Sequence, residues 1–331
     1  MLRTLFIVGC GALFGACAST ASPPGIREGQ AKDVFESQDY FVVIAKGGDT
    51  TQSLAAKYLG DPAKDWMIED YNGLAKIAPG DKVVIPKHYW NLSGVTTSGY
   101  QLVPILVYHN LAPQAKGRMV IGAKGFEEQM RYLKAQGYRV INSKQFVEFV
   151  SLKRQLPRKS VLLTFDDGYK SFLQYAYPVL KELGFTATLF VYTDFVGAGS
   201  AFSWPDLKKL ADEGFDIQGH SKSHGDMVRA TGEPAGEYDK RLEAELTQPK
   251  ALFQKNLGYV PEILAYPYGR QDDVVAQRTR ERGFVAAFTV RRQGSQSFVD
   301  PYRIHRIQIY PEMNMDEFVR ALNIFSREAI Q

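Results

Sequence analysis

The stretch VLLTFDDG, residues 161–168, decides the fold, because an apolar strand ends there abruptly in two carboxylates and a glycine. Adjacent residues of a regular strand point to opposite faces of the sheet. Asp166 and Asp167 can therefore serve one site only if a turn begins at this point. Gly168 permits such a turn because glycine has no Cβ to restrict its backbone. Taken alone, the motif is also compatible with an ordinary structural loop.

Apolar runs alternate with helical patterns on both sides of this stretch. The expected strands are residues 105–108, 138–141, 161–165, 187–192, 215–218, 262–266 and 284–289. The expected helices are residues 126–136, 144–150, 169–183, 204–213, 237–256 and 273–282. Repeated strand–helix alternation predicts a parallel sheet with helices outside it. The expected fold class is α/β, an incomplete (β/α) barrel of about seven parallel strands over residues 104–331.

Two further polar clusters directly follow expected strands, where a parallel barrel places its active site. The run GHSKSH, residues 219–224, holds two of the five histidines of the chain, His220 and His224. Imidazoles with this spacing can converge on one cation. A carboxylate from the first cluster would complete a two-His, one-Asp site with open positions for water, as catalytic zinc sites require. The alternative is a polar turn with two solvated histidines.

The third cluster is AYPYGR, residues 265–270. A Pro-Tyr-Gly turn fixes the backbone, so we expect the Tyr268 N–H to face an oxyanion. We also expect the Tyr268 ring, with Tyr266 and Pro267, to form a wall that contacts a sugar. Proline and glycine mark loops of any kind, so this motif is weak by itself.

The N-terminal residues predict export and lipid attachment. Arg3 supplies a positive start, residues 5–14 are apolar or small, and small residues surround Cys17. We expect a lipoprotein signal over residues 1–17 with Cys17 lipidated, although Cys10 also fits the local pattern and an ordinary secretory signal is an alternative. Both cysteines of the chain lie in this segment, so the mature chain would have no internal disulfide. Ala18 favours the outer membrane of a two-membrane cell envelope, facing the periplasm or the surface.

A small unit of two strands and two helices is expected ahead of the barrel. Residues 18–38 are rich in Ser, Ala, Pro and Gly and predict a flexible tether. Residues 39–87 contain the strand 40–44, helical segments after Asp49-Thr50 and around Trp66, and the strand 82–86. Residues 88–103 form a linker. The formal net charge of +4, with no long basic run, indicates no nucleic-acid partner.

The small unit resembles a LysM domain. The resemblance rests on Gly48-Asp49-Thr50, Asn72, Pro79-Gly80-Asp81 and Ile85-Pro86, in this order. LysM domains bind glycans that contain N-acetylglucosamine, such as peptidoglycan and chitin. The resemblance therefore implies a carbohydrate-binding module, the alternative being a spacer between the membrane and the barrel.

The three polar clusters together resemble the polysaccharide deacetylase domain, or NodB homology domain, of carbohydrate esterase family 4. The resemblance covers about residues 104–325. It implies that Asp166 is the general base and that Asp167, His220 and His224 bind a divalent metal, zinc first, with cobalt, nickel or manganese as alternatives. The run PILVYH, residues 104–109, resembles the branch that contains biofilm poly-N-acetylglucosamine deacetylases.

Two features depart from the family pattern. The family has an arginine that orients the base, but Leu264 and Ala265 occupy that stretch here and Arg270 is the nearest guanidinium. The usual Leu-x-His acid is also missing, so we expect His305 to be the catalytic acid. His109 is a comparable candidate for the substrate site, or else a core histidine.

The resemblance implies a metal-dependent enzyme that removes N-acetyl groups from N-acetylglucosamine units of an exopolysaccharide, peptidoglycan or a chitin-like polymer. Two alternatives follow from the same residues. One is a wall lipoprotein that binds glycan without catalysis, and the other is an O-acetyl esterase on the same fold.

Overall fold

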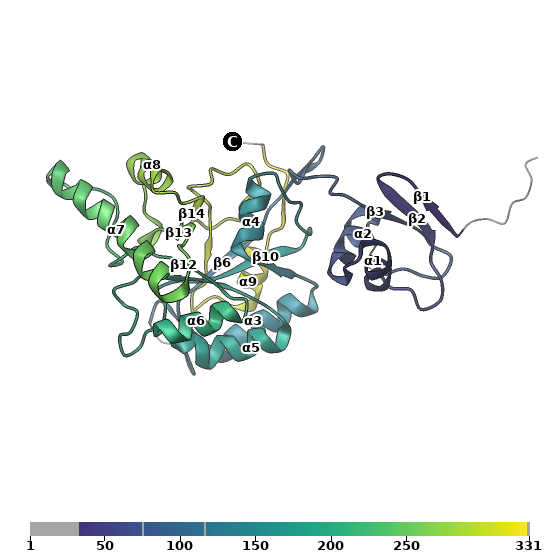
Figure 1. Cartoon of the computed structure of the whole chain (residues 1–331). Coiled ribbons are helices and arrows are strands. Elements are labelled where there is room, and N and C mark those ends of the chain that lie inside the picture. The colour runs from purple at the N-terminus through teal and green to yellow at the C-terminus, as the bar shows by residue number, and fades with distance from the viewer. Residues whose placement is uncertain (1–32, 75, 116, 330–331) are drawn as a thin grey trace, which may run out of the picture.

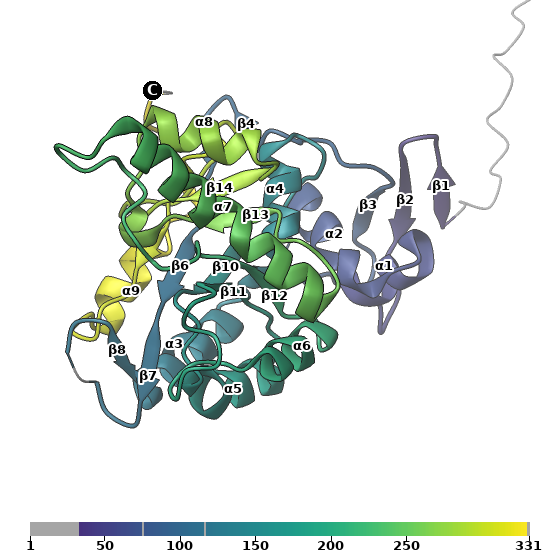
Figure 2. The ribbon, with the colours of Figure 1, turned by 60° about the vertical axis from the view of Figure 1, so that its left-hand side comes forward.

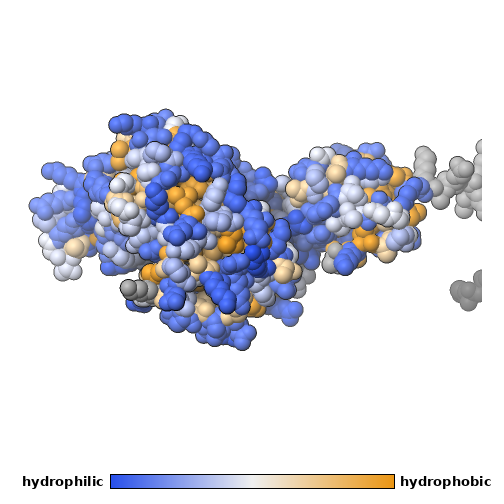
Figure 3. All heavy atoms as spheres, turned by 90° about the horizontal axis from the view of Figure 1, so that it is seen from below, coloured by the Kyte–Doolittle hydropathy of each residue, from blue (hydrophilic) through white to orange (hydrophobic). Residues whose placement is uncertain are grey.

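The computed structural model describes residues 33–74, 76–115 and 117–329. The predicted signal with Cys17, and most of the predicted tether, lie outside these residues. A small N-terminal lobe and a larger body follow one another along the chain (Figure 1). From below, they form two bulges joined across a narrower waist, with a mainly hydrophilic surface (Figure 3). Within the described residues, no helix is long and apolar enough to cross a membrane.

The lobe is a three-stranded antiparallel sheet with two helices. Its elements are β1 (Val34–Glu36), β2 (Tyr40–Ile44), α1 (Thr51–Leu59), α2 (Asp65–Asn72) and β3 (Lys82–Pro86), in the sheet order β1-β2-β3. Thr50 and Ser53 form a capping box that starts α1. The Asn72 side chain bonds both the N–H and the carbonyl of Val84, which ties α2 to β3. β1 lies in the segment that we expected to be a flexible tether, so that expectation is corrected for residues 34–36.

The body is built on parallel strands. Seven of them follow the order β14-β13-β12-β11-β10-β6-β15, and all their pairings are parallel. The strands are β6 (Ile105–Tyr108), β10 (Ser160–Phe165), β11 (Thr188–Val191), β12 (Asp216–Gly219), β13 (Ile263–Ala265), β14 (Ala286–Phe288) and β15 (Ile307–Gln308). This confirms the predicted incomplete barrel. We did not predict β15, and β9 (Arg139–Ile141) pairs only with the first half of β10.

Helices cover the barrel from outside (Figure 1). They are α3 (Ala123–Ala135), α4 (Ser143–Val150), α5 (Tyr177–Leu183), α6 (Trp204–Asp212), α7 (Ala235–Leu257), α8 (Asp273–Glu281) and α9 (Met315–Ala321). A π-helical turn, Phe172–Ala176, precedes α5. Short strands complete the fold. β4 (Val95–Thr96), β5 (Gly99–Gln101) and β16 (Phe325–Ser326) form one sheet, and β7 (Asn110–Ala112) pairs with β8 (Val120–Gly122).

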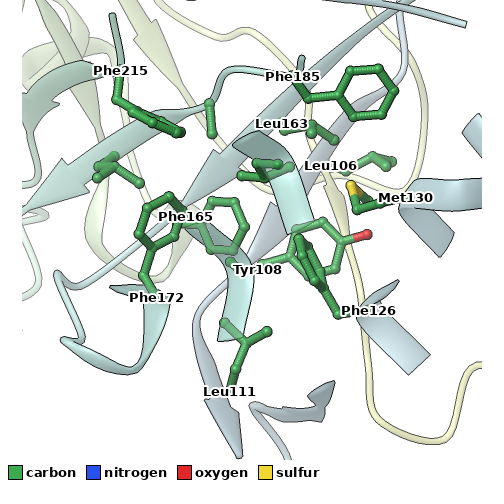
Figure 4. Packing of buried hydrophobic residues seen from close by; sticks show 14 of the residues in the cluster. Leu106, Tyr108, Leu111, Phe126, Met130, Leu163, Phe165, Phe172, Phe185 and Phe215 are labelled. Atoms are coloured by element: carbon green, nitrogen blue, oxygen red, sulfur yellow. The ribbon is translucent and has the colours of Figure 1, made fainter. Parts of the chain in front are cut away.

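The alternation of β10 sorts its side chains into two layers. Val161, Leu163 and Phe165 belong to the larger core cluster, which also contains buried residues of α3, α5 and α6. In that layer the rings of Tyr108, Phe126, Phe165 and Phe172 pack edge to face or stacked, with centroids 4.8–5.8 Å apart (Figure 4).

Leu162 belongs to a second cluster that includes inward-facing residues of neighbouring strands, such as Ile105 and Phe190. Because strand side chains alternate, Thr164 and Asp166 continue this inner face. Burial of apolar area in the two layers fixes the register of β10 and therefore the place where its carboxylates emerge.

The lobe contacts the body at the end of the barrel opposite the carboxylates. Arg139, at the start of β9, pairs with buried Asp65 at 2.9 Å and with Glu69 at 3.0 Å, both on α2. The Trp66 ring lies 6.2 Å from the rings of Tyr89 and Trp90 in the linker. These contacts combine a partly buried ion pair with aromatic packing.

We predict that Arg139→Ala loosens the lobe without unfolding the barrel. The substitution leaves the buried Asp65 carboxylate without its cation, which costs about 1–3 kcal/mol at this contact. Trp66 and Trp90 are two of the three tryptophans of the chain, so tryptophan emission should shift to longer wavelength at a denaturant concentration below the main transition. Arg131→Ala, which removes exposed pairs with Glu127 and Glu182, is the control. Identical unfolding curves for the two variants would contradict the prediction.

Candidate active site

The end of β10 forms the predicted turn. Asp167 has a φ of 73° and Gly168 a φ of 95°, and the Gly168 N–H donates to the Asp166 carbonyl at 3.0 Å. A Cβ on Gly168 would lie 3.0 Å from Val191 Cγ1, so the position needs glycine for space as well as for its backbone angle. The turn brings both carboxylates to His220, with Asp166 Oδ2 at 4.0 Å and Asp167 Oδ1 at 3.5 Å from its Nε2.

Asp167, His220 and His224 form a candidate metal centre. Asp167 Oδ1 lies 3.5 Å from His220 Nε2 and 3.2 Å from His224 Nε2. Bonds of about 2.0–2.2 Å in tetrahedral geometry place ligand atoms roughly 3.3–3.6 Å apart. Asp167 Oδ1 is buried and has no hydrogen bond within the described residues. A buried carboxylate oxygen without a partner fits a cation between the three side chains.

A neighbouring carbonyl orients the His220 ring. His220 Nδ1 lies 2.7 Å from the carbonyl oxygen of Ala265 on β13. The carbonyl can only accept, so Nδ1 carries a hydrogen, and Nε2, which faces Asp167, is the ring nitrogen that a metal would bind in the neutral ring. His220 is buried, whereas the His224 side chain is 23% exposed. The loop that carries His224 therefore has to be held in place by other contacts.

Arg306 binds the Asp166 carboxylate, which is not part of the candidate metal centre. Its Nη1 and Nη2 atoms each donate to one oxygen of Asp166 at 2.7 Å, and both side chains are buried. Sequence reasoning missed Arg306 and pointed to Arg270, which instead pairs with Asp226 on the surface. The signal was present in the run IHRIQI, residues 304–309, where an arginine interrupts an apolar strand.

Both carboxylates are held in their charged form. Burial raises the pKa of Asp166, but the charges of Arg306 and His220 outweigh burial and bring it below its usual range. Burial likewise opposes ionisation of Asp167, and the two histidines lower its pKa far below the usual value. At neutral pH, Asp166 is an ionised group beside the candidate metal centre, as a general base must be.

The two remaining histidine candidates lie in different places. Burial lowers the pKa of His109, against the opposing charges of Asp166 and Asp167, and its Nδ1 is 3.3 Å from Gln308 Nε2. His109 directly follows Tyr108, which pairs with Phe165 and whose carbonyl accepts from the Asp166 N–H, so His109 lies next to the carboxylates in the sheet. The His305 ring contacts Gln293 at 2.6 Å and lines a cavity of about 890 Å³ on the open side of the barrel. The structure does not bring His305 to the carboxylates, and its role as an acid stays a prediction.

Aromatic side chains flank the histidines. The Tyr268 ring is 65% exposed and packs edge-on against the His224 ring at 4.7 Å. The Tyr192 ring, which sequence reasoning missed, lies 5.2 Å from the His224 ring. The expectation that Tyr266 and Pro267 form part of a sugar-binding wall is wrong. Both are buried, and the Tyr266 hydroxyl donates to the carbonyl of Tyr302.

A comparison with known protein families finds a match over the middle of the barrel domain. Residues 153–287, which contain all three polar clusters, match the family model described as polysaccharide deacetylase. YxkH of Bacillus subtilis, whose name places it among the polysaccharide deacetylases, is 27% identical over 216 residues, which cover 65% of this chain and 74% of that protein. The poly-β-1,6-N-acetyl-D-glucosamine N-deacetylase of Staphylococcus epidermidis is 26% identical over 191 residues, 56% of this chain and 66% of that protein.

Solved structures share the barrel. The Streptococcus pyogenes deacetylase PplD superposes with a TM-score of 0.61 at 23% identity, covering 68% of this chain and 99% of that chain. IcaB from Ammonifex degensii superposes with a TM-score of 0.58 at 24% identity, covering 68% and 97%. At this identity the superpositions show a common fold, consistent with the incomplete barrel described above.

We predict that Arg306→Met destabilises the protein by about 3–5 kcal/mol at pH 7, because it leaves a buried carboxylate without its partner. Arg306 keeps the pKa of folded Asp166 low, so its stabilisation is present above the unfolded pKa of about 4 and is lost as the pH falls through the folded value. The difference from wild type should therefore shrink below about pH 4 in urea titrations. Arg270→Met, at an exposed pair, should cost no more than about 1 kcal/mol. Equal losses in both variants would contradict the assignment.

Proposed function

We propose that this enzyme, which carries a polysaccharide deacetylase domain, is a divalent-metal-dependent hydrolase that removes N-acetyl groups from N-acetylglucosamine units of a polysaccharide. One observation carries the proposal. The unpaired oxygen of Asp167 lies within 3.2–3.5 Å of two imidazole nitrogens, beside an ionised carboxylate that Arg306 holds. This arrangement supports a metal-binding triad with a general base beside it at one end of the barrel.

The residues of the chain divide the work of amide hydrolysis. A divalent cation, when bound by Asp167, His220 and His224, polarises the acetamide carbonyl and lowers the pKa of water. Asp166 accepts the proton of the attacking water, and the bidentate contact with Arg306 keeps its oxygens in one orientation. His109, neutral at pH 7, lies beside the carboxylates and is proposed to take up the proton that Asp166 has accepted and to pass it to the departing amine. The products are acetate and a free glucosamine amine.

The substrate proposal rests on the relatives and on the aromatic flanks of the site. The staphylococcal relatives are named as deacetylases of poly-β-1,6-N-acetyl-D-glucosamine. The exposed Tyr268 ring beside His224 offers an apolar face of the kind on which sugar rings stack. Zinc is the proposed metal because two imidazoles and one carboxylate with open positions suit it, although cobalt, nickel and manganese accept the same ligands.

The N-terminal segments complete the proposal. The order β2-α1-α2-β3, which follows the additional strand β1, supports a LysM-type module that binds peptidoglycan or another glycan with N-acetylglucosamine. Lipidation of Cys17 would anchor the enzyme in the cell envelope, at the outer membrane of a two-membrane cell. Membrane fractionation of wild type against Cys17→Ala tests the anchor.

Acetate release from N-acetylglucosamine oligomers is the primary test. We expect wild type to release acetate, and Asp166→Asn to reduce the rate on the order of 10²–10⁴-fold because the base is lost. Asp239→Asn, an exposed carboxylate on α7, should match wild type. Parallel assays with β-1,6-linked oligomers, β-1,4-linked oligomers, peptidoglycan and O-acetylated glycans identify the substrate. Absence of acetate from every N-acetylated substrate would overturn the proposal.

Metal removal should abolish activity reversibly. Dialysis against a strong chelator should stop acetate release, and zinc should restore it in wild type. His224→Ala should recover little at the same zinc concentration because one ligand is missing. Zinc at 100 times its dissociation constant should also stabilise wild type by about 2.7 kcal/mol, measured by denaturation. Full activity in the chelated protein would refute metal dependence.

A further inference from the structure

Glu245 on α7 is a buried carboxylate bound to the loop between the two metal-binding histidines. Its Oε2 atom accepts hydrogen bonds from the backbone N–H groups of Lys222 and Ser223, each at 2.9 Å. Its Oε1 atom accepts from Ser223 Oγ at 2.5 Å. The residue is only 6% exposed, so its charge is compensated mainly by these three donors.

The loop that Glu245 binds has an uncommon backbone. Ser221 has a φ of 69° and His224 a φ of 62°, values that residues with a side chain seldom adopt. Such residues persist where the surrounding structure fixes them. Between them, the N–H groups of Lys222 and Ser223 both point at one carboxylate oxygen, a charge-assisted arrangement stronger than two neutral hydrogen bonds.

The two imidazoles are anchored differently. His220 directly follows β12, is buried, and is oriented by the carbonyl of Ala265. His224 lies four residues further on, and its own N–H donates to Ser221 Oγ at 3.1 Å. The path of the chain from one imidazole to the other therefore depends on Ser221 and on Glu245.

The helix that carries Glu245 is itself firmly placed. Leu242 and Leu246 of α7 pack with Leu264 and Tyr266, so α7 lies against β13 and the turn that follows it (Figure 2). A second link to the loop, from Lys222 Nζ to Asp194 at 2.7 Å, is partly exposed and holds less tightly. Glu245 therefore binds the N–H groups of the loop, while the backbone N–H groups of Thr193 and Asp194 donate to the carbonyls of Ser221 and Lys222 at 3.3 and 2.9 Å.

We propose that Glu245 is a positioning residue that sets the separation of His220 and His224 for metal binding. The inference rests on the proposed metal-dependent function. The carboxylate acts through the backbone of Lys222 and Ser223 and touches neither substrate nor metal. Outer-shell partners of this kind typically contribute 10–100-fold to metal affinity.

The test measures zinc affinity in metal-free protein by competition with a chelating dye at pH 7. Glu245→Gln replaces one acceptor oxygen by an NH₂ group that cannot accept, and should weaken zinc binding 10–100-fold. Ser223→Ala removes only the hydroxyl donor and should have a smaller effect in the same direction. Glu243 lies on the same helix as Glu245 and forms a partly exposed ion pair with Arg282, so Glu243→Gln should bind zinc like wild type. Amide hydrogen exchange of Lys222 and Ser223 should accelerate in Glu245→Gln before zinc is added.

The outcomes separate this inference from the proposed function. Wild-type zinc affinity and unchanged exchange in folded Glu245→Gln would overturn the role of Glu245, while acetate release by wild type would still support the deacetylase. A wild type that binds zinc but releases no acetate would overturn the deacetylase, and weak binding in Glu245→Gln would still support the positioning role. Should Glu245→Gln not fold, Ser223→Ala decides, and wild-type affinity in that variant overturns the inference. No zinc binding by wild type overturns both.

Discussion

The buried contact of Arg306 with Asp166 is the constraint on which the candidate site depends. A carboxylate that leaves water tends to take up a proton, because burial penalises its charge. Arg306 reverses that tendency with two hydrogen bonds and a full positive charge. Two further donors of the guanidinium bond the Thr289 carbonyl and the Thr164 hydroxyl. The guanidinium therefore joins β10 to the segment after β14 across the interior of the barrel.

This role explains how an incomplete barrel can place its groups accurately. β14 and β15 lie at the two edges of the parallel sheet, and the segment before β15 joins β14 through a bridge between Phe288 and Ile304 and through neighbouring backbone hydrogen bonds. The guanidinium of Arg306 lies 5.3 Å from the Phe190 ring and 5.8 Å from the Phe288 ring, which adds cation–π contacts inside the barrel. Polar and apolar contacts thus converge on one side chain beside the seam between β14 and β15.

Much of the architecture follows from local sequence patterns. The apolar run 161–165 and the alternation of such runs with helical patterns predicted the parallel sheet. Burial of the apolar residues then decides the strand register. The candidate metal ligands could also be predicted from the sequence, because Asp167, His220 and His224 all follow strands whose carboxyl ends lie at the same end of the barrel. Arg306 was not, because it is 140 positions from Asp166 and no local rule joins them. The sequence also did not reveal that the Tyr266 ring is buried, because a Tyr-Pro-Tyr turn does not show which ring faces inward.

Backbone strain marks the same edge of the barrel. Of the five non-glycine residues with positive φ in the described part of the chain, four belong to the site: Asp167, Ser221, His224 and Tyr268. Such conformations cost free energy and gather where function requires a particular side-chain direction. The lobe contacts Arg139, which pairs with the start of β10, about 20 Å from Asp166 at the usual rise per strand residue. If the lobe binds glycan as proposed, the part of the polymer bound there cannot be the part that lies at Asp166. Binding and catalysis would then act on different segments of one glycan, and the length of the glycan would couple them.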